Sequence, residues 1–164
     1  MSTQIREATK ADFESIWPIF HDIVFAGETY PYDPDTNKKE ACRLWMEVPQ
    51  FIYVVEEAGE ILGTYYIKAN QPALGAHVCN CGYMVSNNSR GKGIGTLMCQ
   101  HSQKIAVEKN FKAMQFNLVV STNEKAVRLW GNLGFKKLAT LPKAFNHKSL
   151  GLVDAFIFYK WLNQ

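Results

Sequence analysis

The chain has 164 residues, of which 47% are hydrophobic and 20% charged, and its formal net charge is +3. This length suits one compact domain, so we expect a single domain over residues 1–164. No stretch reaches the roughly 20 apolar residues of a membrane helix, and the start of the chain lacks the apolar segment of a secretory signal. These features favour a cytoplasmic protein. The mild charge, without Lys/Arg-rich runs, argues against nucleic acid as a partner.

The four cysteines lie in segments typical of regular structure, so we expect free thiols at Cys42, Cys79, Cys81 and Cys99. His77, Cys79 and Cys81 alternate along a predicted strand. Their spacing misses the usual zinc patterns and offers no fourth ligand, so we predict no metal site.

Apolar spacing and turn residues predict the elements of the first half of the chain. We expect, in order, a strand (4–8), a helix capped by Thr9 or Asp12 and ending near Gly27, a proline-rich loop (28–35), a second helix beginning at Thr36 or Asn37, and a hairpin of two strands (51–56 and 60–68).

The second half is predicted to contain a strand (77–85), a helix (94–108), a strand (114–120), a helix (123–133) and two closing strands (135–141 and 153–159). Strands 77–85 and 114–120 are apolar and flank a helix, which is typical of a parallel βαβ unit. The predicted fold class is α/β (mixed α+β), with a central mixed sheet of about seven strands and about four helices.

The segment between strand 77–85 and helix 94–108 contains the run Arg90-Gly91-Lys92-Gly93-Ile94-Gly95-Thr96. Glycines let backbone N–H groups approach a ligand, and the helix N-terminus and basic side chains favour an anion. The run therefore indicates a pyrophosphate site, with an ordinary tight turn as the alternative. Its spacing matches neither a P-loop nor the G-x-G-x-x-G dinucleotide pattern.

Arg90-x-x-Gly93-x-Gly95 resembles the R/Q-x-x-G-x-G/A pattern with which GNAT N-acetyltransferases bind the pyrophosphate of acetyl-CoA. Asn123-x-x-Ala126-x-x-Leu129-Trp130-x-x-x-Gly134-Phe135 is similar to the next segment of that superfamily. The resemblance implies acetyl-CoA as cosubstrate, bound where two parallel strands splay apart. It implies cofactor-binding roles for Met84, Val85, Arg90, Gly91, Lys92, Gly93, Ile94, Gly95, Thr96, Asn123 and Trp130.

Two residues depart from the family pattern. Trp130 stands where the family commonly has a tyrosine that protonates the leaving thiolate, and an indole cannot do this at neutral pH. We interpret Trp130 as a packing residue on the helix that binds CoA. Asn80 stands where many members have a glutamate base, and an amide cannot take a proton from an ammonium group.

Val78-Cys-Asn80-Cys-Gly-Tyr83, the run from Phe116 to Asn123, and Leu141-Pro-Lys-Ala144 with Val153-Asp-Ala155 together resemble fungal GNAT enzymes that acetylate azetidine-2-carboxylate and related proline analogues. This narrower resemblance implies that Asn80 and Asn117 are catalytic residues that contact the substrate. A local role for Asn117 at a strand end is the alternative.

The proline-rich loop contains two further candidates for substrate binding, Glu28 and Tyr30. Loops often carry function, although an ordinary connection fits the same composition.

The sequence thus predicts an acetyl-CoA-dependent N-acetyltransferase that acts on a small amine or amino acid by direct transfer in a ternary complex. A protein or peptide N-acetyltransferase and a non-catalytic CoA-binding regulatory domain are the alternatives. We expect acetyl-CoA and a small molecule as partners, without nucleic acid, membrane or metal, and a homodimer stays open.

Overall fold

The computed structural model describes residues 2–162, and its strands form one sheet in the order β1-β2-β3-β4-β5-β7-β6. The strands are β1 (Gln4–Glu7), β2 (Phe51–Glu57), β3 (Glu60–Ala69), β4 (Val78–Val85), β5 (Ala113–Val120), β6 (Lys136–His147) and β7 (Gly151–Trp161). The helices are α1 (Phe13–Ala26), α2 (Lys38–Cys42), α3 (Ile94–Glu108) and α4 (Glu124–Asn132). The predicted mixed fold of about seven strands and four helices is confirmed.

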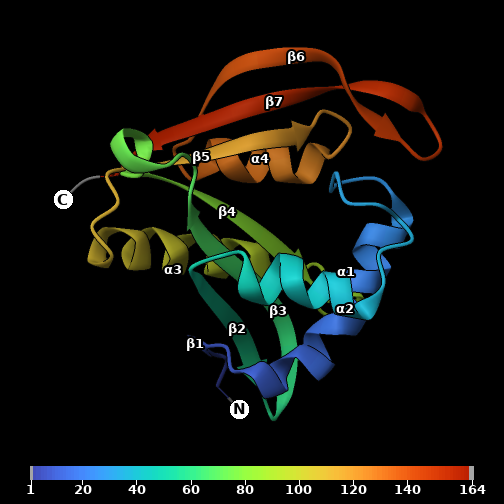
Figure 1. Cartoon of the computed structure of the whole chain (residues 1–164), viewed down its shortest axis with the longest axis vertical. Helices are drawn as coiled ribbons and strands as arrows, with labels where there is room; N and C mark the ends of the chain where they lie inside the picture. Colours follow the sequence, from blue (N-terminus) through green and yellow to red (C-terminus); the bar gives the residue numbers. More distant parts are fainter. Residues whose placement is uncertain (1, 163–164) are drawn as a thin grey trace.

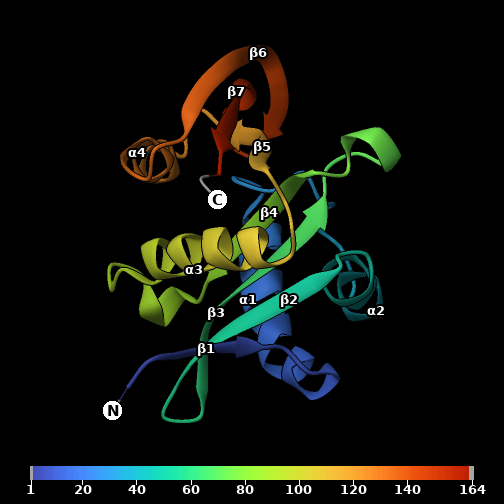
Figure 2. The same cartoon turned by 90° about the vertical axis from the view of Figure 1, so that its left-hand side faces the viewer.

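Helices cover both faces of the sheet (Figures 1 and 2). Helices α3 and α4 lie on one face, where Met98, Cys99 and Trp130 pack in a core with Cys79 and Phe116 of the strands. Helices α1 and α2 lie on the other face, over a second core that contains Phe20, Trp45, Val54, Tyr66 and Met84. None of the helices in the described part of the chain is both long and apolar enough to cross a membrane.

Strands β4 and β5 are the parallel pair at the centre of the sheet, and they separate soon after they meet. Their pairing joins Val78 to Ala113 and Cys79 to Met114, and ends there. Beyond this point the sheet is open between the two strands, because β4 stays paired with β3 and β5 with β7. The predicted splayed pair is confirmed, and it creates the opening that the site uses.

The first helices begin and end as their sequence predicts. Gly27 follows α1 with φ of 65°, a left-handed conformation that suits glycine at a helix end. Asn37 caps α2 by accepting a hydrogen bond from the backbone N–H of Glu40 at 2.9 Å. A π-helical turn, Arg43–Glu47, continues α2.

The β6–β7 hairpin is longer than predicted. The pairing passes an irregularity between Leu141 and Phe145, where Lys143 has φ of 52° and donates its backbone N–H to Asp154 at 3.0 Å. Pro142 lies in this bulge, on an edge strand, so its missing N–H does not end the strand. The tip then reaches α1, where the N–H of Lys148 donates to the backbone oxygen of Gly27 at 3.0 Å (Figure 1).

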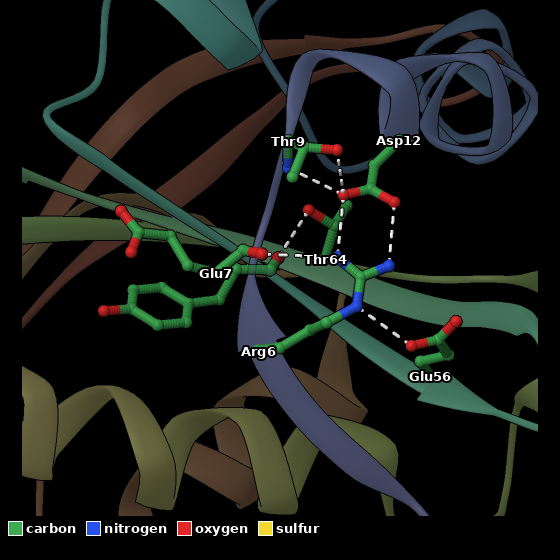
Figure 3. Close-up of polar contacts among 7 residues, drawn as sticks. Arg6, Glu7, Thr9, Asp12, Glu56 and Thr64 are labelled. Carbon is green, nitrogen blue, oxygen red and sulfur yellow. Dashed lines mark hydrogen bonds and ion pairs between the residues drawn. The ribbon is translucent and has the colours of Figure 1, made fainter.

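A group of ionic contacts fixes the start of the chain against the sheet (Figure 3). Arg6 on β1 forms two hydrogen bonds with the carboxylate of Asp12, at 2.8 and 2.9 Å, and a third with Glu56 on β2 at 2.9 Å. Asp12 also accepts the backbone N–H of Thr9 at 2.7 Å. The Arg6 guanidinium holds the pKa of Asp12 at about 2, so this carboxylate is charged at neutral pH.

Candidate active site

Two adjoining pockets lie at the opening between β4 and β5. The first, the tyrosine pocket, measures about 450 Å³ and is lined by Tyr30, Tyr32, Tyr66, Tyr83 and neighbouring residues of β3, β4, β5 and α4. The second, the glycine-loop pocket, measures about 680 Å³ and is lined by the glycine loop and the start of α3, the end of α1 with the loop after it, the start of α4 and the β6–β7 tip. Tyr30, Tyr83, Val85 and Asn123 line both, so the two pockets meet along the splayed strands.

The glycine loop has the geometry of an anion site. Gly91 and Gly93 have φ of 78° and 76°, and nothing lies within 4 Å of a Cβ built on either one. Gly93 immediately precedes α3, so the positive end of the helix dipole faces the pocket. Arg90 lines the pocket, whereas Lys92 is exposed and lines neither pocket. The open space beside the loop and its positive character fit a pyrophosphate group.

The predicted cofactor residues Ile94, Gly95, Thr96 and Asn123 lie at the N-terminal ends of α3 and α4. Ile94, Gly95 and Thr96 line the glycine-loop pocket. Asn123 caps α4, accepting the backbone N–H of Ala126 at 3.4 Å, and lines both pockets. Most of the residues that the family motifs single out therefore line the glycine-loop pocket.

Trp130 is a buried residue of α4 at the wall of the tyrosine pocket. Its ring centre lies 4.7 Å from that of Phe116, 5.2 Å from that of Tyr83 and 6.3 Å from that of Phe135. These contacts are those of a packing residue, in keeping with an indole that has no proton to give at neutral pH.

The register of β3 with β4 determines which backbone groups face the opening. Ser86 donates its N–H to Leu62 on β3 and Asn70 donates to Val78, so the even-numbered residues of β4 pair with β3. The N–H and C=O groups of odd-numbered residues such as Val85 then point toward β5. Met84 has its backbone turned toward β3 and its side chain in the core under α1, and it lines neither pocket.

Tyr66 and Asn80 form the polar floor of the tyrosine pocket. The Tyr66 hydroxyl donates to Oδ1 of Asn80 at 3.1 Å, and Nδ2 of Asn80 donates to the backbone oxygen of Gln115 on β5 at 3.0 Å. Asn80 is buried, and each end of its amide keeps one further hydrogen-bonding position. This contact links β3, β4 and β5 just where β4 and β5 separate.

Asn117 is exposed on β5 and also lines the tyrosine pocket. Its Nδ2 donates to Oδ1 of Asn70 at 2.7 Å, and its Oδ1 accepts from Nε2 of Gln115 at 3.1 Å. Asn80 and Asn117 thus both contact Gln115, and the structure brings the two predicted asparagines to one pocket on adjacent strands.

The loop after α1 contributes Tyr30 and Tyr32 to the lining of the tyrosine pocket. Tyr30 donates its hydroxyl to the backbone oxygen of Tyr83 at 2.7 Å, and its ring stacks on Tyr32 with centres 5.6 Å apart. Because Tyr83 is odd-numbered, this oxygen is one that faces β5. Glu28 is exposed and lines only the glycine-loop pocket, whereas Tyr30 lines both pockets.

The tyrosine pocket offers little acid–base chemistry. Among its described lining residues there is no carboxylate and no histidine. Burial raises the pKa of Tyr30 and of Tyr66, so both hydroxyls keep their protons at neutral pH. Burial also raises the pKa of Cys81, which lines the pocket as well as the core under α3. Cys81 and Asn80 are neighbours on β4 and point to opposite faces, but the separation of β4 and β5 lets the pocket reach both faces of the sheet.

A family model described as "Acetyltransferase (GNAT) family" matches residues 4–135, which is most of the chain. The chain belongs to the GNAT family. The sequence is 34% identical over 149 residues to N-acetyltransferase aca1 of Schizosaccharomyces pombe, covering 80% of this chain and 71% of that protein. The prediction of a GNAT N-acetyltransferase is confirmed, and a fungal relative fits it.

Solved structures agree with this GNAT membership. A GCN5-related N-acetyltransferase from Kribbella flavida superposes with a TM-score of 0.92, at 41% identity over 98% of each chain. YncA of Salmonella typhimurium, solved with its cofactor acetyl-CoA, shares the fold with a TM-score of 0.84, at 22% identity over 100% of this chain and 96% of that one.

The GNAT protein is therefore an acetyl-CoA-dependent acyltransferase, and the glycine-loop pocket fits that cosubstrate. The described residues contain no group of three or more His, Cys, Asp or Glu side chains placed to hold a metal ion.

Several residues at the site were not predicted. Tyr66 and Lys68 line the tyrosine pocket, and His147 and Leu150 of the β6–β7 tip line the glycine-loop pocket. Successive side chains of a strand point to opposite faces, so the sequence already indicates that Tyr66 and Lys68 lie on one face of β3 and Tyr65 and Ile67 on the other. The sequence does not specify the register of β3 with β4, which brings Tyr66 and Lys68 beside Asn80.

Proposed function

We propose that this acetyltransferase transfers the acetyl group to the nitrogen of a small amine or amino acid, directly, in a ternary complex with acetyl-CoA. The observation that carries the proposal is the meeting of the two pockets at the splayed strands, along Tyr30, Tyr83 and Val85. The glycine loop lies on one side of this junction, and the tyrosine pocket with its polar floor lies on the other. Two reactants bound in such adjoining pockets meet without leaving the enzyme.

Asn80 and Asn117 have the proposed role of orienting the acceptor. Each amide has both a donor and an acceptor, and Asn80 keeps one free position at each end beside its contacts to Tyr66 and Gln115. Groups held in this way present fixed hydrogen bonds to a bound ligand without having to rearrange. The narrower resemblance to enzymes of azetidine-2-carboxylate supports a proline-like amino acid as one acceptor to test.

The backbone of β4 supplies the remaining polar contact. Bound acetyl-CoA supplies an acetyl group activated as a thioester. The N–H of Val85 points toward the opening and is the proposed donor to the oxygen that becomes negative as the acceptor nitrogen attacks. Met84 is not suited to this role through its N–H, which the strand register directs to β3.

Proton transfer in the proposed reaction depends on water. The described lining of the tyrosine pocket contains no carboxylate, and its buried phenols hold their protons. The acceptor therefore reacts as the neutral amine: its N–C bond forms as the thioester oxygen becomes negative, the C–S bond then breaks to release the CoA thiolate, and the proton on nitrogen leaves to water. Since a thiol has a pKa near 8.5, the thiolate is a tolerable leaving group without help from Trp130.

An acetyl-cysteine intermediate is not part of the proposal. Cys81 is the cysteine that lines the tyrosine pocket, and burial raises the pKa of its thiol, which keeps it in the unreactive protonated form. Direct transfer and a covalent intermediate differ in their kinetics. Initial rates measured over a grid of acetyl-CoA and amino-acid concentrations should give intersecting double-reciprocal lines, whereas parallel lines would indicate an acetyl-enzyme.

A protein or peptide acetyltransferase is the competing function, and it needs a groove open to a chain. One wall of the tyrosine pocket is formed instead by Tyr30 and Tyr32, whose stacked rings pack against Trp45 and Phe20. Acetylation of an N-terminal peptide in preference to every free amine in a panel would favour that competing function.

A further inference from the structure

The charged side chains that line the tyrosine pocket are all positive. Its described lining contains two cations, Lys68 and Lys125, and no carboxylate. Lys125 also lines the glycine-loop pocket, where a cation suits the phosphates of the cosubstrate. Lys68 is thus the cation that lines the tyrosine pocket alone. None of the ion pairs found among the described residues includes it.

Lys68 is placed beside the groups proposed to orient the acceptor. It lies directly opposite Asn80 in the pairing of β3 with β4, so the two side chains leave the same face of the sheet with Cβ atoms about 5 Å apart. Its Nζ lies 5.4 Å from the centre of the Tyr66 ring. The ammonium group is therefore close to the Tyr66–Asn80 contact.

The neighbours of Lys68 are fixed. Tyr66 packs its ring edge-on against Trp45, with centres 4.9 Å apart, and donates its hydroxyl to Asn80. A cation held beside a fixed aromatic ring and a fixed amide, in a partly enclosed pocket, attracts an anion more strongly than an exposed lysine does. The same cation repels the second charge of a diamine.

Building on the proposed function, we infer that Lys68 binds a carboxylate of the acceptor, and that the enzyme selects amines that carry a carboxylate over diamines and neutral amines. The carboxylate lies at Lys68 and the amine extends past Asn80 toward the opening between β4 and β5. Lys68 acts on specificity: it holds the acceptor and takes no part in bond making.

The experiment compares matched acceptors with wild-type enzyme and the variants Lys68→Gln and Lys68→Arg. Azetidine-2-carboxylate, proline and alanine are each paired with their carboxamides, and putrescine serves as the diamine. The quantity measured is the ratio of kcat/KM for each acid to that for its amide. Differences in amine reactivity cancel when this ratio is compared between wild type and variant.

We expect Lys68→Gln to lower the acid-to-amide ratio about ten- to hundredfold, mainly through KM of the acid, because one charge-assisted contact is lost. Lys68→Arg should keep most of the preference. Lys136→Gln, which changes an exposed lysine of β6 away from both pockets, is the matched control and should leave the ratio unchanged.

The outcomes separate this inference from the proposed function. An unchanged ratio in a folded Lys68→Gln enzyme, or a wild-type preference for amides or putrescine, overturns the role of Lys68 while acetylation of small amines stands. No acetylation of any acid, amide or diamine would instead refute the proposed function itself. Thermal unfolding of each variant shows whether it is folded under the assay conditions.

Discussion

Gly82 lies directly under the ring of Tyr66, and a Cβ built on Gly82 would stand 2.4 Å from Cε2 and 2.9 Å from Cζ of that ring. The two residues are cross-strand partners on β4 and β3. The missing side chain at position 82 is what lets the Tyr66 ring lie flat across β4 and place its hydroxyl on Asn80.

The first prediction is that Gly82→Ala displaces the Tyr66 ring and breaks its hydrogen bond to Asn80. Overpacking of this kind costs about 1–3 kcal/mol of stability. We expect kcat/KM for amino acids to fall at least about tenfold, with acetyl-CoA affinity nearly unchanged, as measured by steady-state kinetics and calorimetry.

The control for this prediction is Gly131→Ala in α4, where nothing lies within 4 Å of the added Cβ. This substitution should leave activity intact and stabilise the helix slightly. Equal effects of the two alanines on the acceptor kinetics would contradict the role assigned to Gly82.

The second prediction concerns the glycine loop. Gly93→Asp should weaken acetyl-CoA binding by at least about tenfold, or 1.4 kcal/mol, because it places a negative side chain in the open space beside α3 where we place the pyrophosphate. Gly59→Asp in the β2–β3 turn is a matched control, since Gly59 also has positive φ, at 81°, and no atom within 4 Å of its Cβ. Both variants bear similar backbone strain, so a difference between their affinities for acetyl-CoA comes from the new side chain at the binding site. Equal affinities would remove the glycine loop from the cofactor site.

The third prediction separates the two asparagines. Asn117→Ala removes an exposed side chain, so stability should change by less than about 0.5 kcal/mol while turnover falls roughly ten- to hundredfold. Asn80→Ala should reduce turnover similarly and also cost about 1–3 kcal/mol of stability, because the Tyr66 hydroxyl loses its buried acceptor.

Both asparagine variants should bind acetyl-CoA as tightly as wild type does. Chemical denaturation, acceptor kinetics and cofactor titration measure the three quantities separately. Wild-type turnover in both variants would eliminate acceptor orientation by these residues, although the family assignment would remain.

The sequence predicts the parts of the site that residues close together in the chain form, and it does not predict the parts that distant residues form. The glycine loop and the motif from Asn123 to Phe135 are local patterns, so the loop, α3 and α4 were predicted close to their observed bounds. Tyr66 and Lys68 join Asn80 only through the register of β3 with β4, which no local pattern specifies.

The β6–β7 hairpin was predicted too short for a related reason. Pro142 is usually a sign that a strand ends, but a bulge at this position carries the edge strand past the proline to His147. The contact of Lys148 with Gly27 brings the hairpin tip beside the end of α1, joins segments more than a hundred residues apart and depends on that extension.

The fourth prediction concerns the pH dependence of folding. The pKa of Asp12 falls from 3.8 to about 2 in the folded protein, so its pairing with Arg6 stabilises the fold above about pH 4 and is lost as the pH falls toward 2. Because Arg6 is about a third exposed, solvent screening reduces the effect to about 1 kcal/mol.

Urea unfolding of wild type and Asp12→Asn should therefore differ at neutral pH and converge near pH 2. Glu40→Gln is the control, since Glu40 of α2 pairs with Arg43 of the following turn, both side chains are exposed, and loss of the pair should have little effect. A difference between wild type and Asp12→Asn that stays constant with pH would show that the carboxylate charge is not the cause.

The most direct test of direct acetyl transfer to a small amino acid is the stoichiometry of one enzyme turnover. Enzyme saturated with acetyl-CoA is mixed with azetidine-2-carboxylate, and mass spectrometry follows free CoA, the N-acetyl amino acid and the intact protein together. We predict one N-acetyl product for each CoA released, with no change in protein mass before or after the acceptor is added. Release of CoA without an N-acetyl product, or an acetylated protein that forms before the acceptor is present, would contradict the account.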